Sequence, residues 1–173
     1  LPASFVAEPA SGIYWTAGPG WRYDPSTWSA PRLLVSARHA GCVDLRQRTG
    51  YGAGCEFDGR LSLVRFRGEY LLYARANLAE CVERGGRFVQ LASSADLREW
   101  SPFALVALER YEPSSGDIYF FAVQRSPTRR DRLLALYPLS RPSGACVCAS
   151  FSADGRRWTR PRALVACSRS SPG

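Results

Sequence analysis

The sequence predicts an all-β fold made of antiparallel meanders that repeat along the chain. Short runs of aliphatic, β-branched and aromatic residues alternate with turns that contain glycine or proline, and this pattern continues through most of the 173 residues. No stretch has the periodicity of an amphipathic helix longer than two turns. One turn sequence recurs, which indicates several similar sheets and not one large sheet.

The clearest meander lies between residues 55 and 102. Its predicted strands are residues 61–67, 70–75 and 87–93. In the first strand, Leu61 and Leu63 alternate with Val64 and Phe66, so the two pairs should face opposite sides of the sheet. Gly68 predicts a tight turn before the second strand, because glycine tolerates the positive φ of short hairpins.

A Ser-x-Asp-x-x-x-Trp turn closes this meander at residues 94–100 and recurs at residues 152–158, with a weaker copy at 23–28. The tryptophans of the three copies are 72 and 58 residues apart, a spacing typical of a β-propeller or a related radial array. We expect Asp96 and Asp154 to bind backbone N–H groups of their turns. Trp100 and Trp158 should each be largely buried over the turn.

Further strands are predicted at residues 13–16, 32–37, 117–124, 132–139 and 144–152. The apolar segment 117–124 suits burial on both faces. Residues 1–12 have the character of an irregular arm, residues 40–54 form a long loop, and residues 126–131 form a polar hairpin loop. These features divide the chain into an arm with a partial first blade (1–54), two blades (55–108 and 109–167) and a flexible tail (168–173).

The formal net charge is +8, and every cationic side chain is an arginine because the sequence contains no lysine. A basic chain can bind nucleic acid or another anionic polymer. The arginines are spread along the chain, however, and no RNA-binding strand motif accompanies them. A solvated arginine surface is therefore the preferred interpretation, and nucleic-acid binding is not expected.

Six cysteines allow two interpretations. Cys42 and Cys55 flank a glycine-rich loop and could close it as a disulfide, which would suit a secreted or lumenal protein. Alternatively all six are small buried apolar residues. Cys146 and Cys148 should share a strand face without bonding to each other. The absence of a C-x-x-C pattern and the single histidine, His39, argue against a metal site, and no apolar run approaches the ~20 residues of a membrane span.

The blade motifs resemble those of the five-bladed propeller glycoside hydrolases of family 43 and its relatives in families 32 and 130. The resemblance rests on Asp58, the strand at 61–64, Tyr70-Leu71-Leu72-Tyr73 and the turn at 94–100, and it covers roughly residues 55–167. A complete propeller of this type needs roughly 250 to 300 residues at ~50 residues per blade, so this chain holds about three blades. The resemblance implies a propeller that acts on or binds glycans, without a cofactor. An open ring would need further blades or a partner chain, and a non-catalytic binding or assembly subunit is the alternative.

Glycoside hydrolysis needs two carboxyl groups across the scissile bond. The resemblance implies that Asp58 and Asp117, each before the inner strand of its blade, supply a base and an orienting acid, with Glu80 as a stand-in for the glutamate acid. It also implies that Arg60, Arg75 and Tyr119 bind the substrate. Alternatively, Asp58 and Asp117 only cap turns, as aspartate often does.

Overall fold

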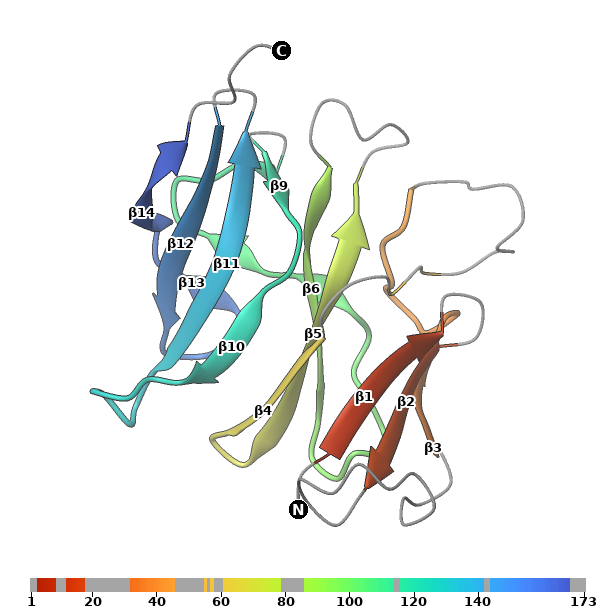
Figure 1. The fold of residues 1–173 in the computed structure, drawn as a ribbon. Coiled ribbons are helices and arrows are strands. Elements are labelled where there is room, and N and C mark those ends of the chain that lie inside the picture. Colours follow the sequence, from red (N-terminus) through yellow and green to blue (C-terminus); the bar gives the residue numbers. More distant parts are fainter. Residues whose placement is uncertain are drawn as a thin grey trace.

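The computed structural model describes residues 3–8, 12–17, 32–45, 55, 57, 61–78, 86–113, 116–141 and 144–168, with only the backbone for 3–8, 12–17 and 166–168. In this part of the chain every regular element is a strand, which confirms the all-β prediction. The strands form three sheets that stand side by side (Figure 1). No helix in the described residues is long and apolar enough to cross a membrane. Residues 169–173 of the predicted tail and the weaker turn copy at 23–28 lie outside the described residues, while Ser168, the first residue of that tail, is the last residue of a strand.

The first sheet has the order β1-β2-β3 and is antiparallel. Its strands are β1 (Ala3–Glu8), β2 (Gly12–Ala17) and β3 (Arg32–Ser36). The prediction of an irregular arm over residues 1–12 is therefore wrong. β1 pairs with β2 over its whole length, from Ala3 opposite Ala17 to Glu8 opposite Gly12. A short strand of this kind depends on its hairpin partner, which local sequence alone does not reveal.

The second sheet is the predicted meander, with the order β4-β5-β6-β7. Its strands are β4 (Ser62–Phe66), β5 (Glu69–Asn77), β6 (Arg87–Ser94) and β7 (Ala104–Leu105). The β4–β5 loop has two residues, Arg67 and Gly68, with φ of 49° and 87°. Two positive φ values are the signature of the type I′ turn that fits the twist of a hairpin, so the predicted turn is confirmed.

The third sheet combines β8 (Ala107–Leu108), β9 (Asp117–Ile118), β10 (Ala122–Arg125), β11 (Leu133–Arg141), β12 (Gly144–Ser152), β13 (Arg157–Trp158) and β14 (Arg162–Ser168). β11 lies between β10 and β12, and the predicted polar loop at 126–131 joins β10 to β11. β8 follows the second sheet in sequence but pairs in parallel with β13. This exchange ties the second and third sheets together through backbone hydrogen bonds.

The predicted single strand at 117–124 is two short strands. Ile118 pairs with Leu139 and Ala122 pairs with Leu136, so four residue steps on one side oppose three on the other. This extra residue makes a bulge, which bends the strand. Ile118 and Val123 are buried while Tyr119 is 48% exposed, so the expected burial on both faces is wrong.

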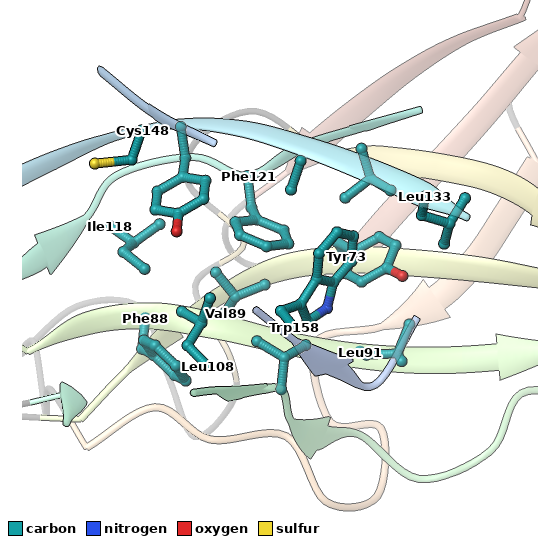
Figure 2. Close-up of a cluster of buried hydrophobic side chains, with 14 of the residues drawn as sticks. Tyr73, Phe88, Val89, Leu91, Leu108, Ile118, Phe121, Leu133, Cys148 and Trp158 are labelled. Carbon is teal, nitrogen blue, oxygen red and sulfur yellow. The ribbon is translucent and has the colours of Figure 1, made fainter. Parts of the chain in front are cut away.

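The core consists of two layers, one on each side of the second sheet. Between the second and third sheets, the rings of Tyr73, Phe121 and Trp158 meet, with centroid separations of 4.9 to 5.9 Å (Figure 2). Between the first and second sheets, Val35 packs in a cluster with Leu72. The alternation predicted for β4 is confirmed, since Leu61 and Leu63 pack in this second layer while Val64 and Phe66 face the first one.

The inner strands of the second and third sheets also lie side by side. The Ser62 hydroxyl on β4 donates to the Val123 carbonyl on β10 at 3.1 Å and accepts from the Val123 N–H at 2.8 Å. The Arg125 guanidinium donates to the Arg65 carbonyl at 2.9 Å. The first strands of neighbouring meanders therefore converge, as the inner strands of a propeller do.

Cys42 and Cys55 form a disulfide, so the structure selects the loop-closing interpretation for this pair. Cys146 is also disulfide-bonded, while Cys148 is a free, buried thiol. Cys146 and Cys148 are both buried on the inner face of β12 and do not bond to each other, as predicted. Burial raises the pKa of the Cys148 thiol, which keeps it protonated.

Candidate functional site

Asp117 lies at the first position of β9, where the third meander begins. One carboxylate oxygen, Oδ1, accepts from the Arg87 backbone N–H at 2.8 Å, and Oδ2 lies 3.5 Å from the Arg87 Nη1. The two side chains are only 16% and 18% exposed. A partly buried carboxylate with both oxygens on one arginine is held in a fixed orientation.

Tyr119, two residues further on, carries two arginines against its ring. The guanidinium carbon of Arg75 on β5 lies 4.4 Å from the ring centroid, and that of Arg87 on β6 lies 5.1 Å away. Both distances are in the range of cation–π attraction. Arg75 is buried, whereas nearly half of Tyr119 remains accessible to solvent. The two arginines thus hold the Tyr119 ring in place, while the exposed part of the side chain remains accessible to a ligand.

Arg75 and Tyr119 line a small hollow at the junction of the second and third sheets, and Asp117 and Arg87 lie beside it. Its walls come from β5 and β6 on one side and from the bulged segment 118–121 on the other. Gly116, just before this segment, allows the backbone to approach β11 closely, because a Cβ there would lie only 2.5 Å from the Ser140 carbonyl oxygen. The close approach to β11 fixes where Asp117 and Tyr119 emerge.

The structure therefore brings together three of the residues expected to form a site, namely Asp117, Arg75 and Tyr119. The others, Asp58, Glu80 and Arg60, lie outside the described residues. The separation of the Asp58 and Asp117 carboxylates, which the two-carboxyl hypothesis needs, stays a prediction. The described residues contain no group of three or more histidine, cysteine or acidic side chains able to hold a metal ion.

Sequence reasoning missed Arg87, which contacts both Asp117 and Tyr119. The residue follows a glycine pair and opens β6, so its place at a strand start was visible in the sequence. Its partner is 30 residues away and belongs to the next meander. Only the packing of the two sheets shows that these two strand starts meet.

The Ser-x-Asp turns lie at the other end of the strands. In the β5–β6 pair, Asn77 opposite Arg87 marks the end near Asp117, and Tyr70 opposite Ser94 marks the end near the turn. Asp96 Oδ1 accepts from the backbone N–H groups of Arg98 at 2.8 Å and Glu99 at 3.1 Å. These hydrogen bonds hold the pKa of Asp96 below its usual range.

The second turn repeats this geometry. Asp154 Oδ1 accepts from the backbone N–H groups of Arg156 and Arg157, both at 2.8 Å. Partial burial raises the pKa of Asp154, but these hydrogen bonds outweigh it and the net shift is downward. The Ser152 hydroxyl accepts from the Gly155 N–H at 2.8 Å, as Ser94 does from Leu97 at 2.9 Å. In both turns, the serine and aspartate side chains thus stabilise the turn through hydrogen bonds to its own backbone.

The two tryptophans differ, although the turns match. Trp158 is 2% exposed, and its Nε1 donates to the Gly155 carbonyl at 3.1 Å. Trp100 is only partly buried at the edge of the smaller core layer, and its Nε1 has no hydrogen-bond partner among the described residues. The expectation of deep burial therefore holds for Trp158 and fails for Trp100. The difference arises because the larger core layer, with Tyr73 and Phe121, surrounds only Trp158.

Comparisons of the sequence with protein-family models and with curated proteins found no match. Comparison of the structure with solved structures found several. The chain is similar to an α-L-arabinanase of Penicillium chrysogenum complexed with arabinobiose, with a TM-score of 0.57, 15% identity, and coverage of 98% of this chain and 46% of that one. It is also similar to the GH93 α-L-arabinofuranosidase of Fusarium graminearum, likewise with arabinobiose, with a TM-score of 0.52, 13% identity, and coverage of 92% and 43%.

The chain spans less than half the length of these two structures. At such low identity the similarity concerns the fold. Three successive sheets, of which the second and third have converging inner strands, are what three blades of such a propeller provide. The chain therefore has the fold of a partial β-propeller of the type seen in glycoside hydrolases, as the sequence motifs indicated.

Proposed function

We propose that this chain is a glycan-binding propeller of the glycosidase type, with its ligand on the surface around Tyr119, next to Arg75, Arg87 and Asp117. The observation that carries the proposal is Tyr119, an accessible aromatic residue near the start of the third meander, which one arginine from β5 and one from β6 hold in place. An exposed aromatic ring offers apolar surface to the C–H face of a sugar, and the neighbouring guanidinium and carboxylate groups can bind hydroxyl groups.

A more specific form of this proposal is that the chain also hydrolyses the glycan that it binds. Two carboxyl groups must flank the glycosidic bond, one as acid and one as base or nucleophile. Arg87 occupies both oxygens of Asp117, which suits an orienting role better than proton transfer. Asp58 would then be the base, and Glu80 the candidate acid.

A non-catalytic glycan-binding or assembly subunit is the second candidate. The same Asp117–Arg87 pair favours it, because a carboxylate that is fully engaged by a structural partner needs no catalytic role. The two candidates share the ligand site and differ in whether bond cleavage follows binding.

Titration calorimetry with a panel of neutral oligosaccharides tests the shared claim. Arabinobiose is the first probe, because both solved structures named above hold it. We expect Tyr119→Ala to abolish the heat of binding. Tyr70→Ala is the matched control, since Tyr70 also carries an arginine, Arg65, at 5.5 Å from its ring but lies away from the hollow. Equal affinity of wild type and Tyr119→Ala would refute the site.

Release of nitrophenol from aryl glycosides separates the candidates. An enzyme should lose turnover in Asp58→Asn, while binding at Tyr119 persists. Absence of turnover in the wild type, together with intact binding, would establish the non-catalytic subunit. Asp117→Asn should weaken both binding and turnover, because the neutral amide loses its ion pair with Arg87.

A further inference from the structure

A second groove, here called the turn-end groove, lies where the second sheet passes into the third. Ser93 and Ser101, which flank the first Ser-x-Asp turn, line one side, and Arg156 and Arg157 of the second turn line the other. Its volume is about 290 Å³. It lies at the opposite end of the strands from Tyr119. It is therefore separate from the proposed glycan site, and its walls come from two sheets that this chain itself supplies.

Part of the turn-end groove is aliphatic. Leu91 on β6 is paired with Ala104 on β7, and Leu105 and Ala107 line the groove further along the chain. Leu105 is 43% exposed, and both alanines are exposed as well. A volume of 290 Å³ is about twice the ~150 Å³ of a cavity that accommodates benzene. The groove therefore has room for a ring with a short side chain, and apolar surface for it to contact.

The Arg156 guanidinium lies at the polar side of the turn-end groove. Its Nη2 is 3.3 Å from the Glu69 Oε2 and 3.3 Å from the Ser93 hydroxyl oxygen, and its Nη1 is 3.3 Å from the Asp154 carbonyl oxygen. These distances are longer than the roughly 2.7–2.9 Å of a strong charge-assisted hydrogen bond. A guanidinium also has five N–H donors, so these three contacts orient it without using all of its donors. Arg156 is therefore oriented and still able to bind an anion.

Arg157 adds a second cation to the turn-end groove. Within the described part of the chain its guanidinium has no hydrogen-bond or ion-pair partner. The backbone N–H groups of Arg156 and Arg157 are already bound by the Asp154 carboxylate, so they are not available to an anion. The available donors are the two guanidinium groups, whose planar fork matches the two oxygens of a carboxylate. The groove thus combines a carboxylate-binding side with an aliphatic side.

We propose that the turn-end groove binds a small carboxylate with an apolar body, with the carboxylate on Arg156 and Arg157 and the body against Leu105 and its aliphatic neighbours. A peptide that binds as an added strand needs a long sheet edge, whereas β7 and β8 have two residues each. The groove therefore suits a small molecule better than an extended peptide. The proposal does not depend on the glycan site, because the two sites share no residue.

A titration of the ¹⁵N-labelled chain followed by NMR tests the ligand class, because it detects weak binding and locates it. The probe is 3-phenylpropionate, which should shift the backbone amide signals of Ser93, Ala107 and Arg157 in a saturable manner. The neutral amide of the same acid keeps the ring and lacks the charge, and it should bind about tenfold more weakly or less. Acetate and inorganic phosphate keep a charge and lack the apolar body, and they should also bind about tenfold more weakly or less.

Three variants test the residues. Arg156→Gln should weaken binding of 3-phenylpropionate about tenfold or more, because it removes a charged hydrogen-bond donor. Glu69→Gln should strengthen binding, because the Glu69 carboxylate competes for the Arg156 Nη2 and repels a second carboxylate. Arg129→Gln is the control, since it also removes one exposed arginine from a loop of the third sheet but does not line the groove. It should bind like the wild type.

The dispersion of the amide spectrum verifies that each variant folds, and Arg157→Gln replaces Arg156→Gln if that variant does not. An increase in affinity on Glu69→Gln is a result that damage to the fold does not produce. The proposal would be overturned if the neutral amide or inorganic phosphate bound as well as 3-phenylpropionate, or if the shifts centred on Tyr119. Equal affinities of Arg156→Gln and Arg129→Gln, or weaker binding by Glu69→Gln, would overturn it as well.

Discussion

Gly155 provides a sharp test of how the second and third sheets hold together. Its backbone has a φ of +78°, in the region that side chains disfavour. Its carbonyl oxygen accepts two hydrogen bonds, one from the Tyr73 hydroxyl at 3.0 Å and one from the Trp158 indole at 3.1 Å. This one residue thus links a strand of the second sheet to the turn and the tryptophan of the third.

The variant Gly155→Ala perturbs this link in two ways. The left-handed backbone costs a residue with a Cβ about 1–2 kcal/mol. The new Cβ would also lie 2.5 Å from Leu71 Cδ1 and 2.8 Å from the Tyr73 hydroxyl oxygen, so both side chains must shift. Overpacking of a core site costs about 1–3 kcal/mol. We therefore expect a total loss of about 2–5 kcal/mol in the free energy of unfolding.

Gly68→Ala is the matched control. Gly68 has a φ of +87°, but no atom lies within 4 Å of its Cβ position, so the substitution carries the backbone cost alone. Urea unfolding followed by tryptophan fluorescence gives the free energy for both variants, provided that the slopes agree. The difference between the variants measures the packing cost at Gly155.

An equal loss in the two variants would refute the packing argument. It would mean that Leu71 and Tyr73 move aside without cost, and that the contact between the sheets is looser than the structure shows. A loss at Gly155 that clearly exceeds the loss at Gly68 would support the link between the Tyr73 hydroxyl and the turn.

Three further predictions concern the turns and the disulfide. Trp158→Ala should lower the free energy of unfolding by about 3–5 kcal/mol. Trp100→Ala should lower it clearly less, because Trp100 is only partly buried and makes no indole hydrogen bond within the described residues. Equal losses of the two variants in urea unfolding would contradict this prediction. The lowered pKa of Asp154 means that its carboxylate stabilises the fold above its ordinary pKa of 3.8, and that this contribution disappears as the pH falls through the lower, folded value. Asp154→Asn should therefore lower the melting temperature at neutral pH and flatten its decline below about pH 4; an unchanged acid profile would contradict the assignment. Cys42 and Cys55 close a loop with a sequence separation of 13. Replacement of both by alanine should lower the free energy of unfolding by about 2–4 kcal/mol. Reduction of the wild-type disulfide should likewise lower the melting temperature.

The sequence by itself determined the features that depend on neighbouring residues. The two-residue turn at Arg67 and Gly68 follows from the freedom of glycine at positive φ. The turns at Asp96 and Asp154 depend on hydrogen bonds between residues close in sequence. The Ser-x-Asp-x-x-x-Trp spacing was therefore enough to predict them. The all-β class and the repeat of similar sheets follow from the same local signals, summed along the chain.

Tertiary structure decided the features that depend on distant residues. The break of the segment 117–124 into two strands arises from its register against β11. Between the two pairs, four residue steps in the segment oppose three in β11, so one extra residue forms a bulge. Trp100 and Trp158 have identical motifs, and only the neighbouring sheet makes one of them a core residue. The association of Arg87 with Asp117 likewise requires that two strand starts from different sheets meet.

The apolar sequence of β11 shows most clearly where sequence information ends. Composition determined that both faces of this strand are apolar, because that is a property of the residues alone. Which face packs against the second sheet, and which remains open, was decided by the order in which the sheets stack. Burial is a relation between elements that lie far apart in the chain, and local propensity does not contain it.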